Sequence, residues 1–267
     1  MNNNSKPIGI FDSGLGGLTL LNKMKCLFPN ETFIYFGDTA HLPYGSKSKQ
    51  TIELYSKKIV DFLILKDVKL IIIACNTASS LASECLKKNY SIPIIEVITP
   101  CVVNALKHTV NNFIGVIGTL ATINSKIYSK KIYSLNGNVT VKEVACPLLV
   151  PIIEEGWHLD IIAKKILTKY LDNFKTTNID SLILGCTHYS IMKKDIVQYF
   201  GDSINIITSS NSINTTISNV LKMNNLNSNS KNNEDSYFVT DLGQTFKEQA
   251  QALLGLESIN IQLINPL

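Results

Sequence analysis

Two short stretches, Leu70-Ile-Ile-Ile-Ala-Cys-Asn-Thr-Ala78 and Leu182-Ile-Leu-Gly-Cys-Thr-His-Tyr189, decide the fold of this 267-residue chain. Each is an apolar run that ends at a cysteine, Cys75 or Cys186, followed by small hydrogen-bonding residues. Such a run, rich in Ile and Leu, is typical of a buried parallel strand, and open α/β sheets bind ligands at the carboxyl ends of these strands. We therefore expect two thiols to face each other across one pocket, an arrangement suited to moving a proton between two faces of a carbon.

Apolar runs alternate with amphipathic stretches along most of the chain, a pattern that predicts parallel sheets covered by helices. The predicted strands are Ile8–Phe11, Thr32–Phe36, Leu70–Ala74 and Ile92–Val97 in a first series, and Phe113–Ile117, Val139–Val144, Ser181–Leu184 and Ile204–Ile207 in a second. The predicted helices are Ser48–Leu65, Thr77–Asn89, Ala121–Leu135 and Leu159–Phe174. We interpret the two series as a diverged internal duplication.

The sequence thus predicts an α/β fold of two similar lobes, each a mostly parallel sheet flanked by helices, with the active site in the cleft between them. Residues 1–98 and 210–267 would form the first lobe, with Asp12 and Cys75, and residues 99–209 the second, with Cys186 and His188. The segment 224–236 is rich in Asn, Ser and Lys, which predicts an exposed, mobile loop. Residues 237–256 are expected to form a strand and a helix that return to the first lobe.

Composition narrows the class of protein. Apolar residues make up 45% and charged residues 17% of the chain, as in globular proteins, and the net charge is only +4. The basic residues are scattered, so we expect no nucleic-acid partner. Six cysteines without a C-x-x-C pair favour reduced thiols in the cytoplasm over disulfides, a zinc ribbon or a redox pair. No apolar stretch is long enough for a membrane span, and the N-terminal residues lack the apolar core of a signal peptide.

Two segments follow the first two predicted strands. The turn Asp12-Ser-Gly-Leu-Gly-Gly17 is interpreted as a substrate-binding turn with Asp12 as a working carboxylate, and a helix starting near Leu18 would point its N–H groups at the ligand. A plain strand-to-helix turn and a phosphate cradle are the alternatives, although the Gly-Lys-Ser/Thr of a P-loop is missing. The segment Gly37–Ser46 is either the rim of the pocket or an ordinary loop, since Pro-Tyr-Gly is common in turns.

The residues around the two cysteines also have simpler interpretations. Asn76 and Thr77 are favoured helix N-caps, and a free cysteine is most often a small buried apolar residue. His188 could tune the Cys186 thiol or act on substrate, and its alternatives are a core histidine or a metal pair with Cys186, for which no convergent ligands are evident. Two cysteines at equivalent points of a duplication favour the catalytic interpretation.

Five segments in order, Asp12–Gly17, Tyr35–Gly45, Ala74–Ala78, Pro147–Gly156 and Gly185–Tyr189, resemble the glutamate racemases of the aspartate/glutamate racemase family. The resemblance implies a homodimeric, cytoplasmic isomerase that uses no cofactor or metal and supplies D-glutamate for peptidoglycan of the cell wall. It implies Cys75 and Cys186 as the catalytic bases, assisted by Asp12, Glu154 and His188. Its implied substrate contacts include Asp12 and His188 together with Ser13, Tyr44, Gly45, Asn76, Thr77, Thr119, Thr122 and Thr187.

One segment departs from the family pattern. The run Ile207-Thr-Ser-Ser210 lacks an Asp that the family often carries there. The alternatives to a glutamate racemase are an aspartate or related amino-acid racemase, a binding protein that regulates a partner, and a thiol-redox or zinc protein.

The residues also suggest how such a site would work. An unperturbed thiol titrates near pH 8.5, and we expect helix N-termini after Cys75 and Cys186 to lower the thiol pKa. Asn76, Thr77 and Thr187 would hold the α-carboxylate of the substrate. Asp12 would either hold the ammonium group or relay a proton to Cys75. Ser13 and the Tyr44-Gly45 turn would hold the side-chain carboxylate. Fixed hydrogen bonds in a dry cavity would stabilise the developing carbanion.

Overall fold

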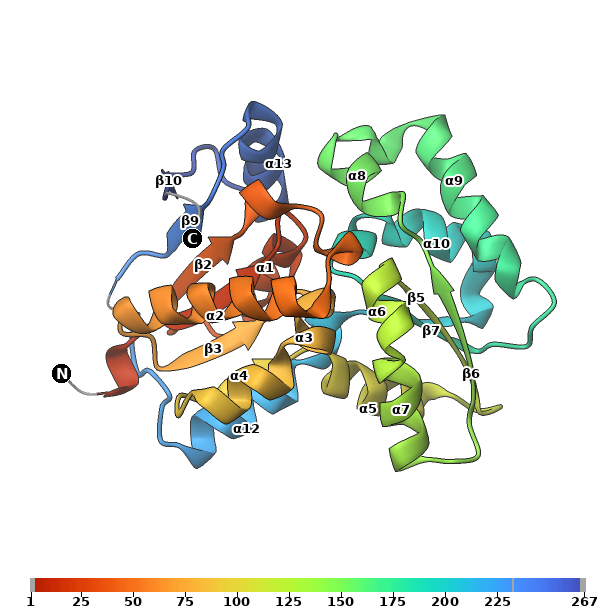
Figure 1. The fold of residues 1–267 in the computed structure, drawn as a ribbon, viewed down its shortest axis with the longest axis horizontal. Coiled ribbons are helices and arrows are strands. Elements are labelled where there is room, and N and C mark those ends of the chain that lie inside the picture. Colours follow the sequence, from red (N-terminus) through yellow and green to blue (C-terminus); the bar gives the residue numbers. More distant parts are fainter. Residues whose placement is uncertain (1–2, 232, 265–267) are drawn as a thin grey trace.

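The computed structural model describes residues 3–231 and 233–264, and within them the chain forms two parallel β-sheets flanked by helices. The first lobe holds a six-stranded sheet of order β10-β9-β2-β1-β3-β4, and the second lobe a four-stranded sheet of order β6-β5-β7-β8. Figure 1 shows the two lobes side by side, with the first on the left. The predicted two-lobed α/β architecture is confirmed.

All pairings between neighbouring strands are parallel. The strands are β1 Ile8–Asp12, β2 Phe33–Gly37, β3 Leu70–Ile73, β4 Ile94–Glu96, β5 Phe113–Gly118, β6 Thr140–Ala145, β7 Ser181–Gly185, β8 Asn205–Ile207, β9 Ser236–Val239 and β10 Ile261–Leu263. Every predicted strand is present within two residues of its expected ends. Strand β10 was missed because Ile-Gln-Leu is too short to show a pattern.

The helices cover both faces of each sheet. The α-helices are α1 Gly17–Leu27, α2 Lys49–Leu65, α3 Asn76–Leu81, α4 Ser83–Asn89, α5 Ile98–His108, α6 Leu120–Ser125, α7 Ile127–Leu135, α8 Leu149–Glu154, α9 Ile161–Leu171, α10 Lys193–Phe200, α11 Ser209–Ser212, α12 Asn214–Met223 and α13 Gln244–Leu254. The 3₁₀ turns are η1 Asn3–Ser5, η2 Thr39–His41, η3 Tyr44–Ser46, η4 Trp157–Leu159, η5 Asp172–Phe174, η6 His188–Met192 and η7 Gly201–Ser203.

Two predicted helices are each divided into two. The helix expected at 121–135 breaks at Lys126, which adopts a left-handed conformation with φ of 57°, so α6 and α7 have separate axes. The helix expected at 77–89 is divided into α3 and α4 at Ala82. Among the described residues, no helix has both the length and the apolar character needed to cross a membrane.

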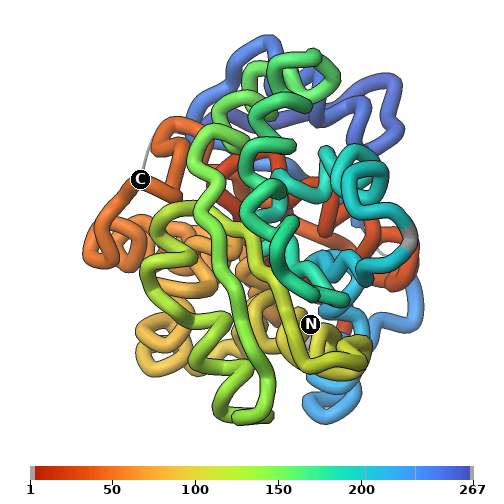
Figure 2. The backbone as a smooth tube through the Cα atoms, turned by 90° about the vertical axis from the view of Figure 1, so that its right-hand side faces the viewer, coloured from red at the N-terminus to blue at the C-terminus, as the bar shows by residue number. Residues whose placement is uncertain are grey.

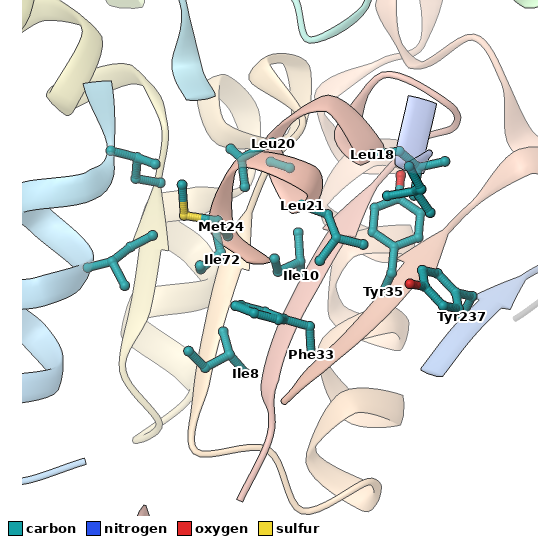
Figure 3. Close-up of a cluster of buried hydrophobic side chains, with 14 of the residues drawn as sticks. Ile8, Ile10, Leu18, Leu20, Leu21, Met24, Phe33, Tyr35, Ile72 and Tyr237 are labelled. Atoms are coloured by element: carbon teal, nitrogen blue, oxygen red, sulfur yellow. The ribbon is translucent and has the colours of Figure 1, made fainter. Parts of the chain in front are cut away.

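The core of the first lobe explains why β3 reads as an unbroken apolar run. Its residues alternate between two clusters: Leu70 and Ile72 face α1, whereas Ile71 and Ile73 face the side covered by α2. Figure 3 shows the first of these clusters, where Ile72 lies among side chains from β1, β2 and α1. Helices on both faces leave no polar side to the strand, which is why the sequence pattern was readable.

The chain crosses between the lobes twice, and the crossing segments lie together. Asn104 of α5 donates a hydrogen bond to Ser212 Oγ of α11 at 3.0 Å, and Figure 2 shows the two segments meeting. The apolar residues of α5 pack on the second sheet, whereas those of α12 pack on the first. On this packing we propose the lobe boundaries near residues 98 and 210.

The Asn-rich segment 224–236 is exposed at most positions, as predicted, but it is anchored to the first lobe. Ser228 accepts a hydrogen bond from Lys69 Nζ at 2.9 Å and donates its backbone N–H to Glu31 Oε1 at 2.9 Å. Lys69 and Glu31 form a buried ion pair at 2.5 Å beneath it, and Asp235 accepts an N–H from the start of β2 at 3.0 Å. The predicted exposure of this segment is confirmed and its mobility stays a prediction, while residue 232 lies outside the described residues.

Candidate active site

The two cysteines stand at the carboxyl ends of interior strands, one in each sheet. Cys75 follows β3 after one residue, and Cys186 follows β7 directly. Both side chains are buried, with 5% and 6% of their surfaces exposed, and both line one small pocket between the lobes. The geometry expected from the two apolar runs is therefore present.

The same pocket gathers most of the other residues singled out in the sequence. It is lined by Ser13, Pro43, Tyr44, Gly45, Cys75, Asn76, Thr77, Thr119, Val150, Cys186, Thr187 and His188. Asp12, Thr122 and Glu154 lie behind this lining and bond to members of it. Val150 was not predicted, and an apolar residue on a helix gives no signal by which it could have been.

Hydroxyl groups from both lobes meet on one side of the pocket. Thr77 Oγ1 lies 2.9 Å from Thr119 Oγ1, which in turn lies 3.0 Å from Thr122 Oγ1. Thr119 caps the start of α6 and comes from the second lobe, whereas Thr77 belongs to α3 of the first. This chain of hydroxyls joins the lobes directly beside the cysteines.

The hydrogen-bond partners of Cys75 are neutral groups. Its Sγ caps α3 by accepting the N–H of Ala78 at 3.5 Å, and it lies 3.9 Å from Ser13 Oγ. Burial raises the pKa of the Cys75 thiol, the nearby Asp12 carboxylate adds to this effect, and the two hydrogen bonds do not offset it. The prediction that a helix N-terminus gives Cys75 a lowered pKa is wrong, because desolvation outweighs the helix end.

A charged pair lies beside Cys186. Thr187 leads into the 3₁₀ helix η6, which continues into α10, so a helix start follows Cys186 as expected, although its first turns are 3₁₀. Cys186 Sγ lies 3.8 Å from His188 Nδ1, and His188 Nε2 lies 2.5 Å from Glu154 Oε1.

The protonation of this pair follows from its contacts. Burial alone would lower the pKa of His188, but hydrogen bonds to Cys186 and Glu154 raise it well above its usual value. Burial would raise the pKa of Glu154, yet the bond and charge of His188 bring it below the usual value. Both shifts favour a protonated His188 paired with an ionised Glu154. Among the described residues no group of three or more His, Cys, Asp or Glu side chains could hold a metal ion.

Asp12 lies at the base of the pocket, fully buried. It accepts the N–H of Gly17 at 2.9 Å and that of Gly14 at 3.3 Å, and Thr187 Oγ1 from the other lobe lies 3.4 Å away. Burial raises the pKa of Asp12, while the His188 charge and these amides partly oppose the shift.

The amides of the glycine turn are thus already in use. Gly14 and Gly17 donate to Asp12, and Leu15 donates to Glu154 Oε1 at 3.0 Å. The expectation that this helix start points its N–H groups at a ligand is wrong, and a phosphate cradle is excluded with it.

The glycines of the turn allow the second lobe to approach closely. A Cβ on Gly16 would lie 2.3 Å from Thr187 Oγ1 and 2.5 Å from His188 Nδ1, and one on Gly14 would lie 2.5 Å from Glu154 Oε1. Real side chains do not tolerate such distances. The glycines of the turn are therefore explained by the close approach of side chains from the second lobe, whereas the sequence suggested the close approach of a ligand.

Tyr44 is one of the residues that line the pocket, and Asp38 accepts its hydroxyl. The hydroxyl donates to Asp38 Oδ2 at 2.5 Å, and Asp38 Oδ1 also accepts from Thr240 Oγ1 at 2.9 Å and contacts His41 Nδ1 at 2.7 Å. The assignment of the Tyr44-Gly45 turn to the side-chain carboxylate stays a prediction, and both residues line the pocket. Asp38, which holds the loop before Gly45, was quoted within its segment but given no role.

A polar residue replaces the missing Asp of the Ile207–Ser210 run at the back of the pocket. Ser209 is buried, and its Oγ accepts a hydrogen bond from Asn76 Nδ2 at 3.3 Å.

A larger surface hollow, at Asn111, Phe174 and Tyr199 in the second lobe, has no cysteine or histidine in its lining.

Two parallel-sheet lobes that bring a pair of strand-end cysteines into one pocket define a two-lobed α/β protein with an inter-lobe site. Residues 19–211 match the model of the Asp/Glu/Hydantoin racemase family, and the chain belongs to this family. It is 41% identical over 251 residues to the glutamate racemase of Geobacter metallireducens, which covers 94% of this chain and 93% of that protein.

Solved structures give the same result. The glutamate racemase of Francisella tularensis in complex with D-glutamate is 39% identical and superposes with a TM-score of 0.91 over 98% of both chains. A glutamate racemase isoform of Bacillus anthracis is 31% identical, with a TM-score of 0.94 over 99% of both chains.

Proposed function

We propose that this protein is a glutamate racemase, an isomerase that interconverts L- and D-glutamate at Cα without a cofactor. The observation that carries the proposal is that Cys75 and Cys186, from two different lobes, line one pocket. The relatives add support, since proteins about 40% identical over nearly the whole chain are glutamate racemases and one was solved with D-glutamate.

Racemisation in this pocket needs two proton transfers. The thiolate of one cysteine takes the proton from Cα, and the electron pair stays on carbon as a planar carbanion. The thiol of the other cysteine then gives a proton to the opposite face. The configuration at Cα is then inverted, and the two sulfurs have exchanged protonation states. Proton exchange with water restores the original protonation states of the sulfurs.

The surroundings of Cys75 suggest how its thiolate forms. Burial and the Asp12 carboxylate both raise the pKa of Cys75. We propose that the substrate ammonium binds beside Asp12, where a positive charge opposes both effects and favours the thiolate. Binding of the amino acid would then itself prepare the base, and an empty pocket would keep the thiol protonated and unreactive.

His188 and Glu154 have the corresponding role at Cys186. The imidazolium is a proton donor 3.8 Å from the sulfur, and the Glu154 carboxylate keeps it charged. We propose that this pair supplies and withdraws the proton that Cys186 exchanges with the substrate. A general acid placed in this way contributes a rate factor of about 10² to 10⁴.

The substrate carboxylates need hydrogen-bond donors. For the α-carboxylate we propose Asn76, Thr77 and Thr187, which line the pocket beside the cysteines. For the side-chain carboxylate we propose the Ser13 hydroxyl, the backbone of Gly45 and the Thr119–Thr122 hydroxyls. Fixed donors in a site this closed stabilise the negative charge that develops on deprotonation.

Three wider statements rest on the family resemblance. We propose that the D-glutamate made here is used in peptidoglycan synthesis, that the protein is cytoplasmic, and that it is a homodimer.

A circular-dichroism time course tests the activity directly. Purified protein with L-glutamate and no added cofactor should bring the optical signal to zero, and in heavy water the D-glutamate formed should carry deuterium at Cα. Signal loss with L-aspartate alone would instead identify an aspartate racemase. Full activity of Cys186→Ser in both directions would contradict the two-base mechanism.

A further inference from the structure

Tyr128, in the first turn of α7, touches the turns that carry both cysteines. Its side chain is fully buried, and its hydroxyl donates to Asn76 Oδ1 at 2.6 Å, next to Cys75 in the sequence. Its ring lies against Gly185, the residue before Cys186, where an added Cβ would stand 3.0 Å from Tyr128 Cε2. Tyr128 does not line the pocket itself.

The Asn76 side chain has a fixed orientation because both of its polar atoms form hydrogen bonds. A primary amide offers one carbonyl oxygen and two N–H donors. The oxygen accepts from Tyr128 in the second lobe, and Nδ2 donates one hydrogen to Ser209 Oγ at 3.3 Å. Since Asn76 lines the pocket, the group left for a ligand is the second N–H.

We infer that Tyr128 is a positioning residue that holds the Asn76 amide as a donor toward an anionic substrate group and sets the spacing of the two cysteine turns. The inference rests on the proposed function, because it takes the ligand to be an amino-acid carboxylate. Without the hydroxyl, Asn76 Oδ1 has no partner and is free to turn into the pocket. A carbonyl oxygen there repels a carboxylate that an N–H would bind.

Tyr128→Phe tests the inference, since it removes the hydroxyl and keeps the ring against Gly185. We expect the KM for glutamate to rise about tenfold, the effect of one buried hydrogen bond, with a smaller change in kcat. Tyr133→Phe is the matched control, because Tyr133 lies on the same helix with 48% of its surface exposed, and it should leave both constants unchanged. An unchanged KM in Tyr128→Phe would overturn the inference.

A double-mutant cycle separates a role through Asn76 from a general loss of packing. In an Asn76→Ala background we expect Tyr128→Phe to change KM less than twofold, because the amide it orients is gone. An equal tenfold rise in both backgrounds would overturn the inference. If the wild-type protein fails to racemise glutamate, the proposed function itself is wrong, and the two failures are thereby distinguished.

Asn76→Asp gives the same test without altering Tyr128, should Tyr128→Phe not fold. One carboxylate oxygen can still accept from the Tyr128 hydroxyl, but the group facing the pocket becomes an anion. We expect KM to rise more than in Asn76→Ala. An equal rise in the two variants would show that the side chain at position 76 does not face an anionic group of the substrate and would overturn the inference.

Discussion

Cys75 and Cys186 occupy corresponding places in two similar lobes, but the groups around them differ in kind. Cys75 bonds to neutral groups: it accepts an amide N–H at 3.5 Å and donates its S–H to a serine hydroxyl at 3.9 Å. Cys186 lies beside a histidine that is itself bound to a carboxylate. The duplicated scaffold fixes where the sulfurs stand, and the loops that follow each strand decide how their protons are managed.

The difference teaches that a symmetric reaction does not need a symmetric site. L- and D-glutamate have equal free energies in water, so kcat/KM must be equal in the two directions for any variant. The difference between the surroundings of Cys75 and Cys186 is therefore measurable only in experiments that follow one proton transfer, such as exchange of the α-hydrogen with solvent.

The cysteine substitutions should have the largest effect. Cys75→Ser and Cys186→Ser are each expected to lower racemisation by about 10³-fold or more, because each removes one of two proton-transfer groups. In heavy water each variant keeps one base, which faces the α-hydrogen of only one enantiomer. We therefore expect the two variants to exchange the α-hydrogens of opposite enantiomers, as followed by NMR.

Two results would break the comparison of the halves. One is exchange of the same enantiomer by both variants, which would place both sulfurs on one face of the substrate. The other is racemisation at the wild-type rate by either variant. Cys26→Ser is the control, since Cys26 is exposed and remote from the pocket, and it should be fully active.

The contact between the halves is tested by Gly16→Ala. The new methyl group would stand 2.3 Å from Thr187 Oγ1 and 2.5 Å from His188 Nδ1, so the Cys186 turn must move away. We expect activity to fall about 10²-fold, since displacements near 1 Å have this effect, and stability to fall by about 1–3 kcal/mol. Gly137→Ala, where an added Cβ meets nothing within 4 Å, should change neither activity nor the melting temperature.

Glu154→Gln should act mainly through the charge of His188 beside Cys186. The Glu154 carboxylate helps to raise the pKa of His188, so its neutral replacement lowers that pKa. The imidazolium is then lost at a lower pH, and the basic limb of the kcat/KM profile should move to lower pH, with activity near neutrality reduced about tenfold. Glu155→Gln, at the exposed neighbouring position, is the control. A basic limb that stays in place would remove His188 from the mechanism.

The strand ends of the site could be predicted from the sequence because they obey local rules. Leu70–Ile73 and most of Ser181–Gly185 are apolar runs, and parallel topology puts the residues after each strand at the carboxyl edge of its own sheet. Cys75, Cys186, Thr77 and Thr187 were placed correctly for this reason.

What the sequence could not supply depends on side-chain directions, on burial and on contacts between the lobes. Asp38 was given no role, but it accepts the Tyr44 hydroxyl at the pocket, and nothing in the spacing of the two residues shows this bond. The pKa of Cys75 was expected to fall, but burial, which no local pattern reports, raises it. In the sequence Tyr128 resembles any core aromatic residue, and only the structure shows that its hydroxyl bonds to Asn76 of the other lobe.

Ser228→Ala should have the smallest effect on activity and stability. It tests whether residues far from the pocket contribute to the difference between the two halves. Its hydroxyl bonds to Lys69 and Glu31 at the end of the first sheet far from the pocket, so its loss should cost about 1 kcal/mol of stability. For a chain of this size we expect the melting temperature to fall by about 2–4 °C, while KM and kcat in both directions are unchanged. Asn229→Ala, at the exposed next position, should not shift the melting temperature. A change in KM with Ser228→Ala would mean that the Asn-rich segment acts on the site, and the asymmetry could then not be attributed to the neighbours of the two sulfurs alone.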